Sequence, residues 1–102
     1  CWDANDLMAK LDTWEAADVA AAPRFGGDLA AALGSIRART IVMPGDQDLY
    51  FTLEDNRREA ALVPGAELRP LHSPYGHCAG APGRFAAEMA IVERTMQDLL
   101  NP

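Results

Sequence analysis

The pattern of apolar and polar positions predicts two short strands that each run out into a loop. Residues 40–43 form a β-branched and apolar run that Pro44-Gly45 ends. Residues 66–72 alternate in part after the turn at Pro64-Gly65. Because Pro70 cannot donate a hydrogen bond to a neighbouring strand, we expect the second strand at or near a sheet edge.

A helix is predicted between the two strands. Thr52 and Asp55 have the spacing of a capping box, and the segment from Leu53 to about Val63 is rich in helix-forming residues. A strand-helix-strand unit makes its two strands parallel and is almost always right-handed. The loops after Met43 and after His72 should therefore lie at the same edge of the sheet.

The last part of the chain is predicted to be a long amphipathic helix that begins near Pro82, a favourable residue for a first helical turn. Its apolar positions recur at spacings of four, three, four and three, which predicts a stripe that packs on the sheet and steadies the loop before it. The stripe consists of Phe85, Met89, Val92, Met96 and Leu99.

Two further helices are predicted before the first strand. One runs from about Asn5 to Ala22, with one face formed by Leu7, Leu11, Trp14 and Ala17. That face is interpreted as packing on the core, with a lid or the wall of a substrate tunnel as the alternative. A short helix over residues 28–33 follows the Gly26-Gly27 turn and ends at Gly34.

The candidate chemistry lies in the two loops that follow the strands. Asp48 belongs to Gly45-Asp46-Gln47-Asp48-Leu49, and His77 belongs to Ser73-Pro74-Tyr75-Gly76-His77. A neutral imidazole acts as a base when a carboxylate holds one ring nitrogen protonated and aimed. Asp48 is predicted to orient His77, which would move the proton. The alternative is that both are ordinary polar residues of turns.

These motifs, with Leu49-Tyr50-Phe51 and a closing helix, resemble the C-terminal third of α/β-hydrolase-fold enzymes, most of all the homoserine O-acetyltransferase group. The resemblance implies an α/β fold with two parallel strands, flanking helices and an incomplete sheet. It also implies Asp48 as the triad acid and His77 as the triad base. Cys78-Ala79-Gly80 departs from the acidic residue and bulky apolar pair usual in that group.

The resemblance also implies a division of the chain. Trp2-Asp3-Ala4-Asn5 is similar to the segment that returns from the helical lid, so residues 1–27 are expected to form the lid-return helix and turn. Residues 28–102 would then carry the acid and the base within a single hydrolase-domain segment.

A nucleophile is missing from the sequence. In this fold the serine occupies a Gly-x-Ser-x-Gly elbow upstream of the acid and the histidine. The chain has only Ser35 and Ser73, and neither has the flanking glycines. Because the chain also begins at Cys1 and opens directly into a helix, we expect it to be a C-terminal fragment that is inactive alone.

Composition narrows the classes of partner. The chain has 102 residues, enough for one domain at most, and a net charge of −6 without a Lys/Arg cluster. This charge argues against binding to nucleic acid or anionic membranes. No apolar run is long enough to span a bilayer. The default expectation for localisation is cytoplasmic.

The cysteines predict no disulfide framework and no metal site, because Cys1 and Cys78 lack the usual ligand spacings. We expect a free buried thiol. Cys78 as a nucleophile served by His77 is disfavoured, since adjacent loop residues usually point apart. His72 is interpreted as a strand residue near the surface and receives no role.

The functional expectation is an acyltransferase whose acceptor is an alcohol such as homoserine. It needs no cofactor, and acetyl-CoA is a possible acyl-donor substrate. The partners expected are these small molecules, the remaining N-terminal part of the same enzyme and a second copy in a possible homodimer. An esterase of the same fold is the alternative, because the triad alone does not set the acceptor. The hypothesis from a different functional class is that the chain is a non-catalytic α/β module.

Overall fold

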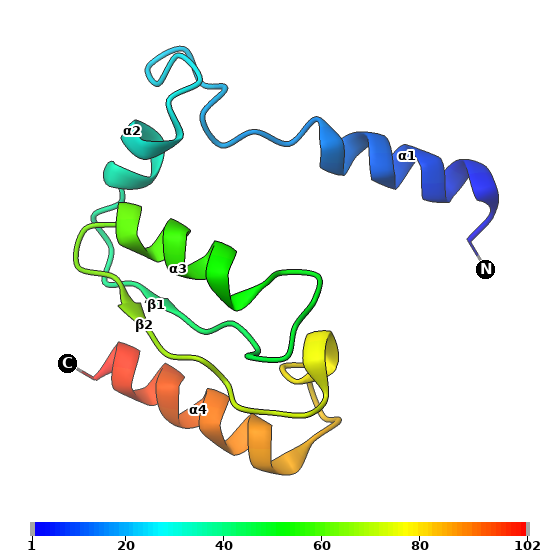
Figure 1. Cartoon of the computed structure of the whole chain (residues 1–102), viewed down its shortest axis with the longest axis vertical. Helices are drawn as coiled ribbons and strands as arrows, with labels where there is room; N and C mark the ends of the chain where they lie inside the picture. The colour runs from blue at the N-terminus through cyan, green and yellow to red at the C-terminus, as the bar shows by residue number, and fades with distance from the viewer. Residues whose placement is uncertain (1, 102) are drawn as a thin grey trace. The chain divides into compact units, whose positions relative to one another are not determined.

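The computed structural model describes residues 2–101. The chain forms two compact units, Cys1–Ala32 and Leu33–Pro102, which are described separately here. The elements, in chain order, are α1 (Ala4–Glu15), α2 (Leu29–Gly34), β1 (Ile41–Val42), α3 (Leu53–Leu62), β2 (Glu67–Leu68), the 3₁₀ turn η1 (Gly76–Cys78) and α4 (Ala86–Leu100) (Figure 1).

Helix α1 begins at a complete capping box. The Asp3 carboxylate accepts the Asp6 backbone N–H at 2.9 Å, and the Asp6 side chain accepts the Asp3 N–H. The helix ends at Glu15, so the predicted extension to Ala22 is wrong. The Asp18 side chain accepts the Ala20 backbone N–H, and such local bonding competes with helical bonding.

The apolar face of α1 does not pack as the sequence analysis favoured. Leu7, Leu11 and Trp14 remain 57%, 42% and 51% exposed, and no residue of α1 is buried. The alternative, that this face belongs to a lid or a tunnel wall, stays a prediction. The short helix α2 lies close to its predicted position, and its start is fixed by the Asp28 carboxylate, which accepts the Ala31 N–H.

Strands β1 and β2 pair in parallel, as the crossover predicts. Ile41 pairs with Glu67 and Val42 with Leu68, and an isolated parallel bridge joins Gly45 to Leu71. Both strands are shorter than predicted. Pro44 and Pro70 interrupt the regular pairing because neither has an N–H to donate. The Leu71 N–H still donates to the Pro44 carbonyl at 2.8 Å, so pairing continues to the strand ends.

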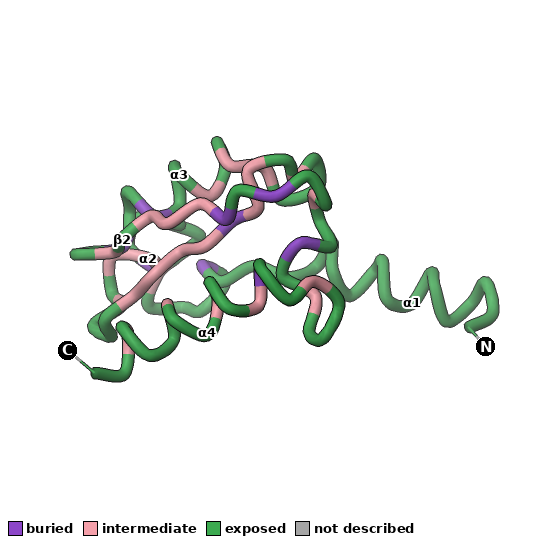
Figure 2. The backbone as a smooth tube through the Cα atoms, turned by 90° about the horizontal axis from the view of Figure 1, so that it is seen from below, coloured by how far each residue is buried: buried purple, intermediate pink, exposed green. Residues whose placement is uncertain are grey.

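Helices α3 and α4 cover opposite faces of this two-stranded sheet (Figures 1 and 2). The Thr52 hydroxyl caps α3 by accepting the Asp55 N–H at 3.2 Å, and the same hydroxyl donates to the Asp55 carboxylate. Helix α4 begins at Ala86, later than the predicted start near Pro82. Gly83 adopts a φ of +72°, which a right-handed helix does not contain.

The C-terminal half of α4 faces the first strand across a small apolar hollow and is joined to the strand regions by polar contacts. Val92, Met96 and Leu99 line a hollow of about 220 Å³ together with Ile41 and Met43 of the first strand region. The Arg39 guanidinium donates to the carbonyls of Asp98 and Leu99, and Arg69 bonds the Asp98 carboxylate at 2.8 Å. The two Arg39 bonds satisfy carbonyls at the helix end that have no partner within the helix.

The core of the C-terminal unit is small. Its buried apolar residues include Ala60, Val63, Leu71 and Ala79, and among residues 2–101 no large side chain is fully buried. Neither residue of β2 is buried, and the buried positions near the strand ends, such as Leu71 and Ser73, lie beyond the regular pairing (Figure 2). So little apolar burial leaves this unit dependent on caps and loop contacts for its stability.

Replacing the cap of α3 should therefore have a measurable cost. Thr52→Ala removes the acceptor for the Asp55 N–H and is expected to destabilise the C-terminal unit by about 0.5–2 kcal/mol. Hydrogen exchange of the α3 amides measures this loss. Thr13→Ala is the matched control, because the Thr13 hydroxyl only returns to the Ala9 carbonyl within α1. Equal exchange in Thr52→Ala and the parent would contradict the expectation.

Candidate active site

The two predicted site residues lie in contact. Asp48 is on the loop after β1, and His77 is on η1 in the loop after β2. The Asp48 Oδ2 lies 3.0 Å from the His77 Nδ1. The Asp48 side chain is only 10% exposed, whereas that of His77 is 56% exposed. The expected meeting of these residues at the strand ends is confirmed, and their catalytic roles stay predictions.

Backbone amides hold the other carboxylate oxygen of Asp48. Its Oδ1 accepts the N–H of Tyr50 at 2.7 Å and the N–H of Phe51 at 3.2 Å. Burial opposes ionisation of this carboxyl, but the hydrogen bonds from His77, Tyr50 and Phe51 outweigh it, so the pKa of Asp48 lies below its ordinary value. Asp48 is thus held as an anion that faces the imidazole.

The side chains of the same dipeptide flank the imidazole. The ring centroids of Tyr50 and Phe51 lie 5.2 Å and 5.4 Å from that of His77. Aromatic rings at such distances contact the imidazole and restrict its orientation. Sequence reasoning used these residues only for family resemblance. The signal for a contact was an aromatic pair two and three residues after the candidate acid.

Two glycines allow the loops to approach. A Cβ on Gly45 would lie 3.2 Å from the Gly76 carbonyl oxygen, and one on Gly76 would lie 3.1 Å from the Gln47 carbonyl oxygen. Gly76 also has a φ of +51°, which other residues rarely adopt. Side chains at these positions would push apart the backbones that carry Asp48 and His77.

A buried polar network lies directly behind the histidine loop. Ser73 and Glu88 are 5% and 9% exposed, and the Ser73 hydroxyl donates to the Glu88 carboxylate at 2.8 Å. The same oxygen accepts the Tyr75 N–H at 3.2 Å. Sequence reasoning missed this network. Its signal was an acidic residue three positions after Phe85, on the apolar side of a predicted helix.

A second aspartate-histidine pair is present at the same edge. The Asp46 Oδ2 lies 2.8 Å from the His72 Nδ1, and the Asp46 Oδ1 accepts the Ser73 N–H at 3.1 Å. The hydrogen bond with His72 is the main cause of a lowered pKa of Asp46, and the hydrogen bond from the Ser73 N–H is the second. His72 is 81% exposed, as a strand-end residue near the surface should be, but it ties the two loops together.

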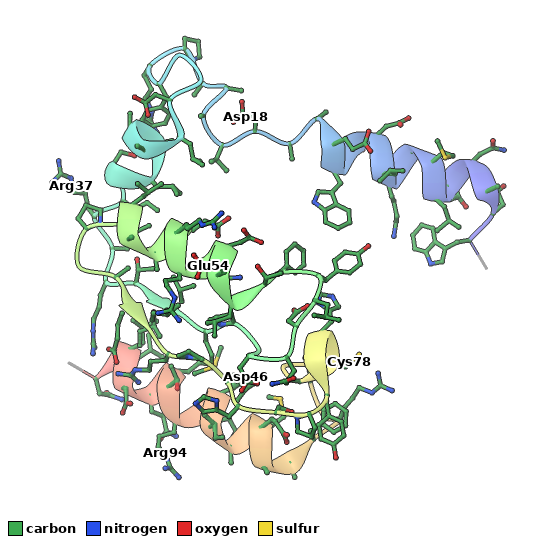
Figure 3. The ribbon with its side chains drawn as sticks, viewed as in Figure 1. Asp18, Arg37, Asp46, Glu54, Cys78 and Arg94 are labelled. Carbon is green, nitrogen blue, oxygen red and sulfur yellow. The ribbon has the colours of Figure 1, made fainter. Side chains whose placement is uncertain are left out.

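Cys78 is a free cysteine, as expected, but it is exposed, so the prediction of a buried thiol is wrong for this residue. It lies on η1, and Asp46 lies on the neighbouring loop after β1 (Figure 3). Exposure follows from the local turn, in which the Cys78 N–H bonds the Tyr75 carbonyl. The expectation for Cys1 lies outside the described residues.

A cavity of about 300 Å³ opens beside the acid and the base, and Asp48, Phe51 and His77 are among the residues that line it. Among residues 2–101, no three His, Cys, Asp or Glu side chains are grouped so that they could hold a metal ion. The same described part of the chain contains no helix long and apolar enough to cross a membrane.

The chain is homologous to esterases and homoserine O-acetyltransferases of the α/β-hydrolase family. An ethyl acetate hydrolase of Pseudomonas veronii is 44% identical over 97% of this chain, and a probable esterase of Corynebacterium glutamicum is 44% identical over 74%. A homoserine O-acetyltransferase of Clavibacter michiganensis subsp. michiganensis is 34% identical over 98%. No family model matches the chain.

Solved structures agree with these relatives. An acetylester hydrolase from Corynebacterium glutamicum and the acetyl esterase MekB each superpose on 99% of this chain with a TM-score of 0.86, at 35% and 38% identity. The expected similarity to hydrolase-fold enzymes is confirmed, but esterases match more strongly than the homoserine O-acetyltransferase group. The chain spans 28% of each solved chain and 21–28% of the curated relatives named above.

The close approach of the two loops gives a test of the site geometry. Gly76→Ala adds a Cβ against the Gln47 carbonyl at a positive φ, and we expect it to destabilise the C-terminal unit by about 1 kcal/mol or more. Urea unfolding measures the change. Gly80→Ala is the matched control, since a Cβ there meets nothing within 4 Å and the φ is not positive. Similar losses in both variants would argue against the proposed crowding.

The lowered pKa of Asp48 predicts a dependence of stability on pH. The ionised carboxylate stabilises the folded loop above the ordinary value of 3.8, and this stabilisation is lost as the pH falls through the lower folded-state pKa. Asp48→Asn should therefore lose less stability than the parent on acidification. Urea unfolding measured from neutral pH down to pH ~2 tests this. Parallel pH curves for the two proteins would contradict it.

Proposed function

We propose that the chain supplies the acid and base of a serine esterase of the α/β-hydrolase family, and that the nucleophilic serine lies outside these 102 residues. The observation that carries the proposal is the contact between the Asp48 carboxylate and the His77 Nδ1 at 3.0 Å. With Nδ1 bonded to a carboxylate, Nε2 is the nitrogen that can accept a proton. The resemblance of residues 45–49 and 73–77 to the acid and histidine loops of α/β-hydrolase-fold enzymes also supports the proposal.

In the proposed reaction, His77 takes the proton of the serine hydroxyl while the serine oxygen forms a bond to the ester carbonyl carbon. Asp48 stabilises the imidazolium. The bond from the carbonyl carbon to the alcohol oxygen then breaks, and His77 gives its proton to the departing alcohol. Water attacks the acyl-serine with His77 again as base, which releases the carboxylic acid and restores the serine.

Short acyl esters are the proposed substrates. This proposal is supported by relatives named as an ethyl acetate hydrolase and an acetyl esterase. The sequence adds support, because Cys78-Ala79-Gly80 follows the histidine in place of the residues usual in homoserine O-acetyltransferases. Small residues there leave room beside the imidazole, where a water molecule could reach an acyl intermediate.

Acetyl transfer is the second candidate, and the 34% identical homoserine O-acetyltransferase favours it. In that reaction acetyl-CoA is the acyl-donor substrate and an alcohol such as homoserine replaces water as the acceptor. The same acid and base serve both reactions, because the acceptor is selected by the access of water and of the alcohol.

The decisive test is the removal of the proposed base in the longer protein that contains this chain. His77→Ala should lower kcat for ethyl acetate and p-nitrophenyl acetate on the order of a thousandfold or more, and Asp48→Asn should have a similar effect. His72→Ala is the comparison variant and should lose far less activity than His77→Ala, because the His72 imidazole contacts Asp46 and not Asp48. Full activity in His77→Ala would refute the assignment.

The acceptor is tested with the unaltered longer protein. Acetyl-CoA and homoserine are supplied together, and both free acetate and O-acetylhomoserine are measured. Hydrolysis that does not depend on homoserine supports the esterase, whereas product formation that requires homoserine supports the transferase. A folded protein that is inactive with both the esters and acetyl-CoA would favour the non-catalytic module.

A further inference from the structure

The first turn of α4 contacts the histidine loop at two points. Phe85, which occupies the N-cap position of α4, stacks on Tyr75 with ring centroids 3.7 Å apart and an interplanar angle of 6°. Glu88, three residues later and on the same side of the helix, accepts the Ser73 hydroxyl at 2.8 Å. The two loop residues precede His77 by two and four positions. The helix therefore contacts the segment that leads directly into the imidazole.

Ser73 connects this helix to both loops. Its hydroxyl donates to Glu88 and accepts the Tyr75 N–H, so the proton of the hydroxyl has one defined acceptor. Its own N–H donates to the Asp46 carboxylate, two residues before the acid Asp48. Ser73 thus joins the helix to the loop of the base through its hydroxyl, and to the loop of the acid through its backbone N–H.

The burial of Glu88 is not explained by stability alone. A carboxylate that is 9% exposed is costly to bury, and glutamate is rarely found inside a small core unless it is paired. A leucine or methionine would fit the apolar stripe of α4 better. Within residues 2–101, the side-chain hydrogen bond of Glu88 goes to Ser73 of the histidine loop, which indicates a task at that loop.

We propose that Glu88 is a positioning residue that acts through Ser73 to set the orientation of the His77 imidazole toward Asp48. This inference rests on the proposed function, because it assigns Glu88 to the base of that reaction. Loss of the Glu88 acceptor frees the Ser73 hydroxyl, which weakens its hold on the Tyr75 N–H and lets η1 shift. Displacement of a catalytic group by about 1 Å can lower a rate on the order of a hundredfold.

The experiment observes the imidazole directly. In the 102-residue chain, ¹H–¹⁵N spectra of the two histidines report whether Nδ1 of His77 carries a proton, and His77→Gln identifies its signal. Glu88→Ala and Ser73→Ala should each lower the fraction of the Nδ1–H form or broaden its signal. Glu88→Gln keeps an oxygen acceptor for Ser73 and should restore the parent spectrum. Circular dichroism checks that each variant keeps its helices.

Matched controls separate positioning from general destabilisation. Glu93→Ala removes an exposed glutamate from the same helix and should leave the His77 signal unchanged. The double variant Glu88→Ala/Ser73→Ala should show the same His77 signal as either single variant, since both substitutions remove the same hydrogen bond. An unchanged His77 signal in folded Glu88→Ala would overturn the proposal. So would the lack of an Nδ1–H signal in the parent chain, or an equal effect in Glu88→Gln and Glu88→Ala.

Kinetics in the longer protein give the second readout. Glu88→Ala should lower kcat about tenfold to a hundredfold with little change in KM, and Glu88→Gln should recover most of it. Unchanged kcat in Glu88→Ala would contradict the positioning role. An inactive parent enzyme would refute the proposed function, whereas the spectra would still decide the hydrogen-bonded link between Glu88 and His77.

Discussion

The structure of the C-terminal unit depends on the parallel pairing of β1 with β2. Parallel strands end at the same edge, and the bond from the Leu71 N–H to the Pro44 carbonyl extends this pairing to the last residues before both loops. Asp48 and His77 are 29 residues apart in the chain, yet each lies a few residues beyond one of these strand ends. This register brings the two loops close together at Gly45 and Gly76, and it allows the Asp48 carboxylate to reach the His77 imidazole.

Long-range features of the fold could be predicted because their sequence signals are strong. The crossover between residues 43 and 66 required parallel strands, and the motif loops then had to meet. Local lengths were predicted less well. The strands were shortened by Pro44 and Pro70, and α4 was delayed by the positive φ of Gly83. A single dihedral angle or a missing N–H decides where such an element begins or ends. The periodicity of apolar residues contains no information on either feature.

The supporting contacts of the site were less visible in the sequence than the acid and the base. Ser73 was considered only as a nucleophile that lacked an elbow, and its bond to Glu88 joins positions 15 residues apart. The position of Glu88 beside the predicted apolar stripe of α4 indicated burial, but nothing in the sequence identified Ser73 as its partner. His72 was taken for a simple surface residue, although its neighbour Ser73 and its partner Asp46 form part of the same contact. Polar networks between loops depend on distances that residue spacing does not give.

Asp48 is held by main-chain N–H groups, whereas the rings of Tyr50 and Phe51 surround the imidazole. Any residue other than proline supplies the same N–H, so the identity of the side chains at positions 50 and 51 is not tied to the retention of the acid. During evolution, the surface around the imidazole could therefore diversify while the carboxylate kept its place. Substitutions at these two positions could therefore reshape the surface beside the imidazole without loss of the bonds that hold the Asp48 carboxylate.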